Sequence, residues 1–444
     1  MRRSSVLRRV VHRSVGVAAA ATGVALAAWL GAASAPPALA VAGGLAQGQG
    51  PYDVLILNGR VIDGNGSPPI SADIGIRDRH IVDIGSLGKA SSRRVIDAGG
   101  LTVTPGFIDV HSHSAAGLAG GLKEGRQLLA QGITTVAINP DGGGPTDLRT
   151  QRATYQKQGI GVNVALYVPH GSIRREVLGM EDRAPTAAEL ERMVTLARHG
   201  MEAGGIGLSS GLYYAPGIYA KTDEVIALAK VVGDMGGVYE SHIRDEADYN
   251  IGLVAAVDEV IRISEQARIP GIVAHMKALG PANWGLSTVI VDHLKAARDR
   301  GVQVYADQYP YEASGTGIVG ALVPRWAEVG GRTEMLKRIQ GPEHSRLAAD
   351  IKRNFERRGG PSTLVISRYA PDPSLEGKTL AEVAAAMGKS PEEASMELLL
   401  RGDASLVSFN MSEPDIELIM RQPFTMTCTD GDLLPFGQGK PHPR

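Results

Sequence analysis

From residue 101 onward, short strand-like runs alternate with longer helix-like runs. This alternation is the pattern of strand–helix units around a parallel sheet. Eight such pairs over about 330 residues predict a (β/α)8 barrel of the TIM type. An open doubly wound sheet is not favoured, because no glycine fingerprint follows an early strand. The expected strands are 102–110, 133–139, 162–168, 205–212, 238–243, 271–277, 302–309 and 425–430.

Helix-like periodicity fills the segments between these strands and a long insertion before the last one. The insertion covers 315–424, where it could shape or cover the barrel mouth. The expected barrel helices include 123–131, 186–203, 222–235, 253–267 and 288–300, and those of the insertion are 332–340, 345–357, 380–387 and 391–400.

Residues 52–104 have a different rhythm of short apolar or β-branched runs. Asn58-Gly59 and Gly64-Asn65-Gly66 predict turns between these runs. The sequence therefore predicts a small β-sandwich part at 52–104, followed by the barrel at 105–444.

The first forty residues have the layout of an export signal. Five arginines and no acids lie between residues 2 and 13, an alanine-rich apolar run follows, and Ala-Pro-Pro-Ala-Leu-Ala ends at Ala40. This layout predicts a signal peptide at 1–40, cleaved after Ala40, with a linker at 41–51 and an exported mature protein. The alternative is an uncleaved N-terminal membrane anchor. Once the signal is removed, we expect no stable membrane association.

Charge argues against a nucleic-acid partner. The chain has 46 basic and 47 acidic side chains, and removal of the five N-terminal arginines leaves 41 against 47, a net charge of −6. A mildly acidic body without a basic stripe fits a small-molecule substrate better. The lone cysteine, Cys428, excludes a four-cysteine zinc site.

Metal-binding side chains recur where the expected barrel strands end. The first strand ends with His111-Ser-His113, whose imidazoles share one face because they are two residues apart. The fifth and sixth end with His242 and His275, and the eighth ends with Asp430. Barrel active sites lie at the carboxyl ends of the strands. Imidazole and carboxylate ligands suit zinc, so these five residues predict a metal site.

Motifs along residues 52–444 resemble those of the N-acyl-D-amino-acid deacylase (D-aminoacylase) family of the amidohydrolase superfamily. The motifs that carry this resemblance are TPGFIDVHSHS at 104–114, GITTV at 132–136, GLSSGLYYAPG at 207–217, YESHIRDE at 239–246, AHMKALGPANWG at 274–285, DQYPYEASGTG at 307–317, TDG at 429–431 and HPR at 442–444. The resemblance implies a metal-dependent hydrolase barrel with a small β domain.

The resemblance also implies a ligand set for one or two divalent metal ions, with zinc as the expected metal. The four histidines at 111, 113, 242 and 275 match family metal ligands, and Asp430 matches the aspartate that is both a metal neighbour and the general acid/base. Family members supply a further cysteine ligand in an Asn-Cys-Gly turn. That turn reads Asn139-Pro140-Asp141-Gly142 here, so Asp141 replaces the cysteine. A carboxylate at this position could ligate or bridge the ions.

Substrate recognition is implied in the same way. Lys277, Tyr309 and Arg444 match residues that bind the substrate carboxylate, and the match of a family serine falls on Gly315, beside Ser314. The implied activity is metal-dependent hydrolysis of the amide bond of N-acyl-D-amino acids, which gives a D-amino acid and a carboxylate.

Two alternatives to that activity stay open at this point. One is another amidohydrolase activity, on a cyclic amide or a D-dipeptide, and the other is a truncated, inactive homologue. The second arises because the sequence stops at Arg444, directly after the eighth expected strand, whereas family members continue with a last barrel helix and further strands of the small domain. We therefore expect a barrel that is incomplete at its C-terminus.

Overall fold

The computed structural model describes residues 51–440 and His442. The predicted signal peptide at 1–40, nearly all of the predicted linker at 41–51, and Arg444 lie outside the described residues. The chain divides after Pro105 into two compact units, which we describe separately. No helix in the described part of the chain is both long and apolar enough to cross a membrane.

The N-terminal unit is a five-stranded sheet. Its strand order is β3-β2-β1-β4, and β5 pairs with β1. The side chains of Leu55, Val61 and Ile74 are buried in this unit. The strands are β1 (Tyr52–Val61), β2 (Ile70–Arg77), β3 (His80–Gly85), β4 (Ser92–Asp97) and β5 (Thr102–Val103).

The turn predicted at Asn58-Gly59 is wrong, because β1 runs through it without interruption. Asn58 has a positive φ of 59°, and the pairing of β1 with β2 shifts register between Ile56 and Gly59. The Asn58 amide donates to Asp97 Oδ1 at 2.9 Å, which holds the distorted residue against β4. The left-handed conformation that favours a hairpin turn is used here for an irregularity within one strand.

The second unit is built around eight parallel strands in the order β16-β12-β11-β10-β9-β8-β7-β6. The ring closes between the segments that follow its first and last strands: the backbone N–H of Asp430 donates to His111 O at 2.9 Å, and that of His113 donates to Gly431 O at 3.0 Å. The predicted barrel is confirmed. Its strands are β6 (Phe107–Asp109), β7 (Ile133–Ile138), β8 (Asn163–Pro169), β9 (Gly207–Gly211), β10 (Val238–His242), β11 (Gly271–Val273), β12 (Val304–Gln308) and β16 (Thr425–Thr427).

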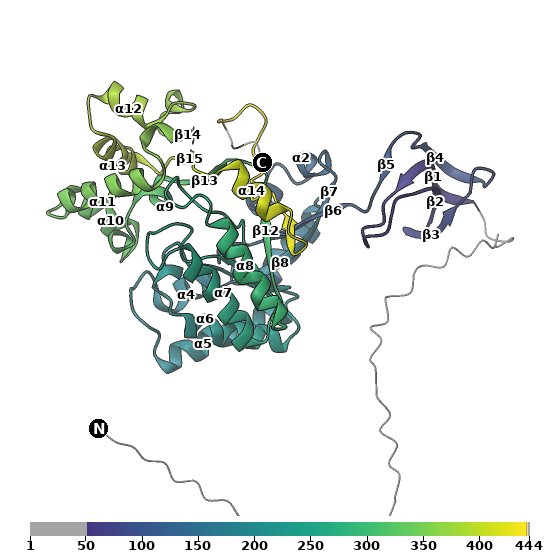
Figure 1. Ribbon diagram of the computed structural model, residues 1–444, viewed down its shortest axis with the longest axis horizontal. Helices are drawn as coiled ribbons and strands as arrows, with labels where there is room; N and C mark the ends of the chain where they lie inside the picture. Colours follow the sequence, from purple (N-terminus) through teal and green to yellow (C-terminus); the bar gives the residue numbers. More distant parts are fainter. Residues whose placement is uncertain (1–50, 441, 443–444) are drawn as a thin grey trace, which may run out of the picture. The chain divides into compact units, whose positions relative to one another are not determined.

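Helices between the strands pack apolar faces around the barrel (Figure 1). In α7, for example, Val257, Val260 and Ile261 are buried at helical spacing. The barrel helices are α1 (Ala115–Ala119), α2 (Arg126–Leu129), α3 (Leu148–Gln158), α4 (His170–Leu178), α5 (Ala187–Glu202), α6 (Thr222–Asp234), α7 (Leu253–Ala267), α8 (Ser287–Asp299) and α14 (Glu413–Met420). The helix expected at 123–131 is reduced to the single turn of α2, which begins after Gly125 at a φ of 57°.

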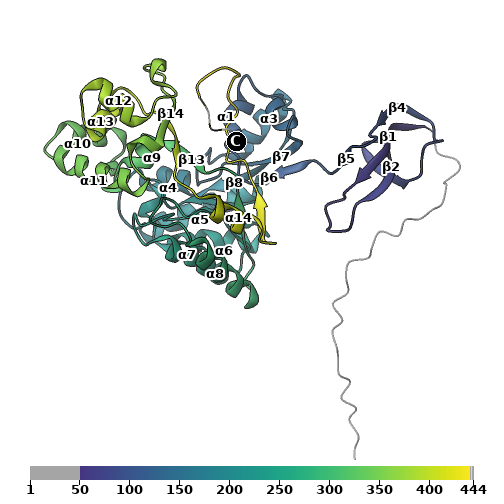
Figure 2. The ribbon, with the colours of Figure 1, turned by 45° about the horizontal axis from the view of Figure 1, so that its top comes forward.

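The insertion between β12 and α14 has a hydrophobic core of its own, which includes Leu347, Ile366, Leu380 and Leu406. Its helices gather apart from α5–α8 in both ribbon views (Figures 1 and 2). They cover an antiparallel sheet of order β13-β15-β14, which the sequence analysis did not predict. The elements are β13 (Ala313–Gly317), α9 (Ile318–Leu322), α10 (Arg332–Gln340), α11 (His344–Arg357), β14 (Leu364–Arg368), α12 (Leu380–Met387), α13 (Pro391–Arg401) and β15 (Ser405–Phe409).

Candidate metal centre and substrate cavity

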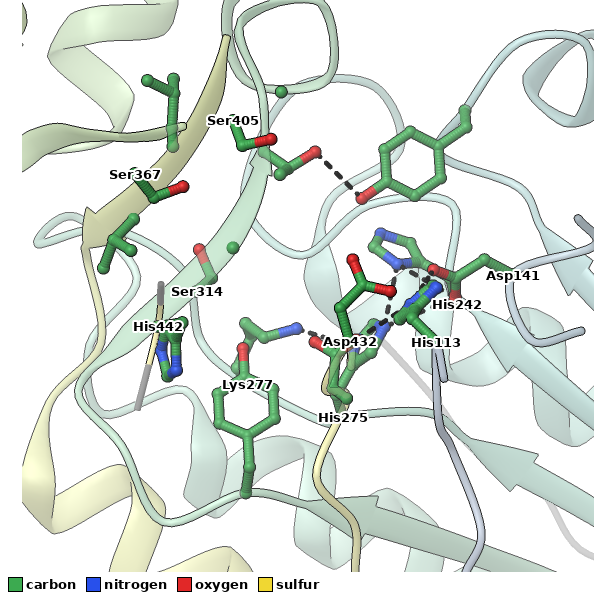
Figure 3. A pocket seen from close by; sticks show the side chains of 18 of the residues that line it. His113, Asp141, His242, His275, Lys277, Ser314, Ser367, Ser405, Asp432 and His442 are labelled. Carbon is green, nitrogen blue, oxygen red and sulfur yellow. Dashed lines mark hydrogen bonds and ion pairs between the residues drawn. The ribbon is translucent and has the colours of Figure 1, made fainter. Parts of the chain in front are cut away.

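The carboxyl ends of four barrel strands bring the predicted metal-binding side chains together. His111 and His113 follow β6, His242 is the last residue of β10, His275 lies two residues beyond β11, and Asp430 follows β16. In Figure 3 the side chains of His113, His242 and His275 converge with that of Asp141, which comes from the turn after β7.

The Asp141 carboxylate lies at the centre of this cluster. Its Oδ1 atom is 3.6 Å from three imidazole nitrogens, namely His111 Nε2, His242 Nδ1 and His275 Nε2. These separations are too long for hydrogen bonds. They suit ligands of a shared ion, because two atoms bound to one tetrahedral metal at about 2.0–2.1 Å lie roughly 3.4 Å apart. His111 Nε2 and Asp141 Oδ1 are also buried without a hydrogen-bond partner among the described residues. The residues present therefore fit a metal ion.

The ligand atoms form two groups that share Asp141. One contains His111, His113 and Asp141, and the other contains Asp141, His242 and His275; within each group the ligand atoms lie within 4.8 Å of one another. Asp141 Oδ2 faces the first group, at 3.5 Å from His113 Nε2. A carboxylate with one oxygen toward each group can hold one ion or bridge two.

Asp430 stands beside the first group but belongs to neither. Its Oδ1 atom is 3.1 Å from His113 Nε2 and 3.5 Å from His111 Nε2. Asp109 fixes the turn that carries it, because the Asp109 carboxylate accepts from the backbone N–H of Thr429 at 2.9 Å and from its hydroxyl at 2.6 Å. The side chain of Asp430 is 9% exposed and lines the cavity. It therefore lies between the metal-binding side chains and the cavity.

Strained backbone conformations gather in the same place. Asn139, Asp141, His275 and Asp430 have positive φ angles of 65°, 56°, 33° and 50°. Non-glycine residues rarely adopt this region, and such strain persists where the surroundings fix a functional geometry. Three of these four residues are metal-ligand or acid/base candidates.

Two buried glutamates that the sequence analysis missed orient the imidazoles from behind. Glu240 Oε1 lies 2.8 Å from His111 Nδ1, so that Nδ1–H donates to the carboxylate and Nε2 turns toward Asp141. Glu246 Oε1 lies 3.2 Å from His275 Nδ1, and Lys277 Nζ lies closer to the same nitrogen, at 2.7 Å. A signal for Glu240 was present in the sequence, since it precedes His242 by two residues on one strand and therefore points to the same face.

The charged groups of the cluster shift one another's pKa values. Burial disfavours ionised Asp141, but the surrounding imidazoles outweigh it and hold the pKa of this carboxyl well below its usual range. Burial likewise disfavours a charged His113, yet the nearby carboxylates of Asp141 and Asp430 raise its pKa to about 9. Burial lowers the pKa of His242. The central carboxylate is thus kept ionised, as a metal ligand must be.

A cavity of about 570 Å³ opens above the cluster. Lys277, Tyr309 and Ser314, which were predicted to bind substrate, all line it. Lys277 Nζ donates to Glu246 Oε1 at 2.5 Å and lies 5.6 Å from the centre of the Tyr309 ring. The ammonium of Lys277 is therefore already paired with a carboxylate.

The insertion sheet supplies the wall that faces the metal cluster. Ser314 on β13, Ser367 on β14 and Ser405 on β15 line the cavity from this side (Figure 3). The side-chain amide of Asn410 donates a hydrogen bond to Ser314 Oγ at 3.0 Å, which connects the wall to the polar residues behind it. Small hydroxyl side chains leave room here for a substrate group.

Fold and site together define a metal-dependent amidohydrolase of the TIM-barrel type. No protein-family model matches the chain. A D-aminoacylase of Alcaligenes xylosoxydans xylosoxydans is 32% identical over 419 residues, which cover 89% of this chain and 77% of that protein. An N-acyl-D-glutamate deacylase of the same organism is 32% identical over 415 residues, covering 88% and 76%.

Solved structures agree. The N-acyl-D-glutamate deacylase of Bordetella bronchiseptica, complexed with zinc and a phosphonate inhibitor that mimics the tetrahedral intermediate, superposes with a TM-score of 0.73 at 31% identity, over 86% of this chain and 76% of that one. A D-aminoacylase structure superposes with a TM-score of 0.70 at 29% identity, over 85% and 76%. The chain belongs to the D-aminoacylase family of N-acyl-D-amino-acid deacylases.

Proposed function

We propose that this protein hydrolyses the amide bond of N-acyl-D-amino acids with the aid of zinc, releasing a D-amino acid and a carboxylate. The observation that carries this function is the Asp141 carboxylate, 3.6 Å from three imidazole nitrogens and at the foot of a cavity that Asp430 also lines. Relatives that act on N-acyl-D-amino acids and a neighbour complexed with zinc support it.

Zinc would be held by the two ligand groups that share Asp141, as one ion or two. When bound, the metal polarises the amide carbonyl, lowers the pKa of a water molecule and stabilises negative charge on the carbonyl oxygen. Glu240 keeps the lone pair of His111 Nε2 directed at the metal position.

Asp430 is the proposed general acid/base. Its carboxylate accepts a proton as a water oxygen attacks the carbonyl carbon, and it returns that proton to the amide nitrogen as the C–N bond breaks. A single group serves both steps because the proton it takes up is the one the leaving amine needs. The strained turn at Asp430, fixed by Asp109 and Thr429, keeps this carboxylate beside His113.

The α-carboxylate of the substrate would bind on the Lys277 side of the cavity. Lys277, Tyr309 and Ser314 line this side, and Arg444 completes the proposed set. A carboxylate fixed at one place and an amide fixed at the metal leave one enantiomer with its side chain toward the insertion wall. We therefore assign selectivity for D over L substrates to these two attachments together with the space for the side chain at the insertion wall.

Export is a separate proposal, supported by the layout of residues 1–40. The arginine-rich start, the apolar run and the small residues before Ala40 fit a cleaved signal peptide. Expression of the full chain with N-terminal sequencing of the exported protein tests it. A mature protein that begins near Val41 supports the proposal, and a membrane-bound protein with an intact N-terminus contradicts it.

The activity is tested by measuring free amine released from N-acetyl-D-leucine and N-acetyl-L-leucine by zinc-loaded protein. We expect release from the D form alone. Asp430→Asn should lower kcat by about 10²–10⁴-fold, the usual contribution of a general acid/base, while zinc content stays unchanged. Asp432→Asn, two residues further along the same loop, is the matched control.

Cyclic amides and D-dipeptides, assayed in parallel, test the other activities of such barrels. Turnover of one of these without release from N-acetyl-D-leucine would overturn the proposed function. Near-normal activity of Asp430→Asn would overturn the role of Asp430.

A further inference from the structure

Arg358 is a buried cation in the cavity wall that has no carboxylate partner among the described residues. It directly follows α11, only 2% of its surface is exposed, and it lines the substrate cavity. Its guanidinium contacts neutral acceptors only: Nε donates to Ala321 O at 3.2 Å, and the two terminal nitrogens donate to Ser408 Oγ at 3.4 Å and Tyr213 Oη at 3.5 Å.

Two other buried arginines, Arg174 and Arg244, each contact a carboxylate. Arg174 donates to Glu224 at 3.1 Å, and Arg244 donates to both oxygens of Glu259 at 2.8 Å. A buried charge without an opposite charge destabilises a protein, because the water it loses is not replaced. Arg358 thus keeps a charge that no carboxylate contacts in the wall of the proposed substrate cavity, and proteins tolerate such a cost chiefly at functional sites.

The remaining charges of the cavity do not provide that compensation. Glu246, the nearest buried carboxylate in the lining, is already paired with Lys277 at 2.5 Å. Glu246 also attracts the charge of Arg358, but this one carboxylate faces two cations and its close contact is with Lys277. The described lining therefore carries one more cation than Glu246 can offset, and Arg358 is the one without a carboxylate contact: its guanidinium donates to the Ser408 hydroxyl on β15 of the insertion sheet.

We propose that Arg358 recognises a second carboxylate of the substrate, carried by its side chain, so that N-acyl derivatives of acidic D-amino acids are the preferred substrates. This inference rests on the proposed function and names its substrate class. The α-carboxylate occupies the Lys277 side, the reacting amide lies at the metal ligands, and the side chain then extends toward the insertion wall. A guanidinium can meet a carboxylate there with two parallel hydrogen bonds.

The test compares N-acetyl-D-glutamate with N-acetyl-D-glutamine, which has the same shape without the charge. The wild-type protein should prefer the glutamate substrate in kcat/KM by at least about tenfold, because a site built around a polar partner rejects the analogue that lacks it. Arg358→Met should remove this preference by slowing the glutamate substrate alone. Arg358→Lys should keep part of it.

Stability separates recognition from a structural role. Arg358→Met removes a buried charge that no carboxylate contacts, so its Tm should be no lower than that of the wild type. Arg325→Met is the matched control, since Arg325 lies 4.3 Å from the centre of the Tyr213 ring and is paired with Glu328. That variant should leave the substrate preference unchanged.

Three results would overturn the inference. Equal rates on both substrates in the wild type would show that no second carboxylate is recognised. An equal loss on both substrates in Arg358→Met would assign Arg358 to the α-carboxylate if Tm is unchanged, and to the fold if Tm falls. Failure of the proposed function is a distinct result, in which no N-acetyl-D-amino acid releases amine, and it would overturn both proposals.

Discussion

The two walls of the substrate cavity are built on different principles. The barrel wall consists of charged and imidazole side chains at the strand ends, and two of them, His111 and His275, contact a buried glutamate behind them. The insertion wall consists of small hydroxyl residues on an antiparallel sheet, with the unpaired Arg358 behind them. The first arrangement fixes a reaction, whereas the second can change its side chains without disturbing the metal. Chemistry and substrate choice are thereby separated within one cavity.

The largest effect on the barrel wall is expected when Asp141, the ligand shared by both groups, is removed. Asp141→Ala should disrupt both ligand groups at once, because Asp141 belongs to each. We expect zinc affinity to fall by at least the 10–100-fold typical of an outer partner, and activity to fall with it. Chelator competition and zinc content per chain measure the effect.

Asp141→Cys is the matched variant, since it introduces the residue that family members resembling this chain carry at this position. A thiolate is a good zinc ligand, so zinc should still bind to the group that contains His242 and His275 in this variant. One sulfur atom can ligate a single ion or bridge two, so comparison of zinc stoichiometry in the wild type and this variant reports how many ions each side chain holds. Unchanged zinc affinity in Asp141→Ala would show that Asp141 is not a ligand.

A smaller effect is expected behind the barrel wall, at Glu240. Glu240→Ala removes the acceptor of His111 Nδ1–H, which frees the ring to rotate or to change tautomer. Zinc affinity should fall by about 10–100-fold, and Glu240→Gln should recover part of it because an amide oxygen still accepts. Substrate preference should not change, since Arg358 lies in the opposite wall. A shifted preference without loss of zinc affinity would contradict the separation of the two walls.

The same contrast explains what could be predicted from sequence. The barrel, and the meeting of His111, His113, His242, His275 and Asp430, follow from local patterns, because the carboxyl ends of parallel strands meet at one edge. Glu240 was not predicted although it shares a strand face with His242, because no local pattern shows that this carboxylate accepts from His111, 129 positions away.

The insertion wall could not be predicted from sequence for a similar reason. Ser314 and Asn410 form a hydrogen bond although they are 96 positions apart in the sequence. The sheet that carries Ser314 is antiparallel, so the strand–helix alternation typical of parallel sheets does not reveal it. Antiparallel pairing between distant short strands is specified by tertiary packing, so residues such as Arg358 acquire meaning only in the folded chain.

The smallest expected effect tests whether the insertion is independent of the barrel. The helices α12 and α5 begin with the same reciprocal cap, Thr379 with Glu382 and Thr186 with Glu189. Replacement of either threonine by alanine should lower the free energy of unfolding by about 0.5–2 kcal/mol. The two helices differ in the core they enter, because Val383 belongs to the insertion core and Met193 to that of the barrel.

Hydrogen exchange should therefore separate the two variants. Thr379→Ala is expected to speed exchange in the insertion and to leave the barrel strands and the zinc content unchanged, since α12 packs in a core of its own. Thr186→Ala should speed exchange in the barrel helices instead. If Thr379→Ala also speeds exchange in β6–β12 and releases zinc, the two walls unfold as one unit, and substrate choice cannot change independently of the metal centre.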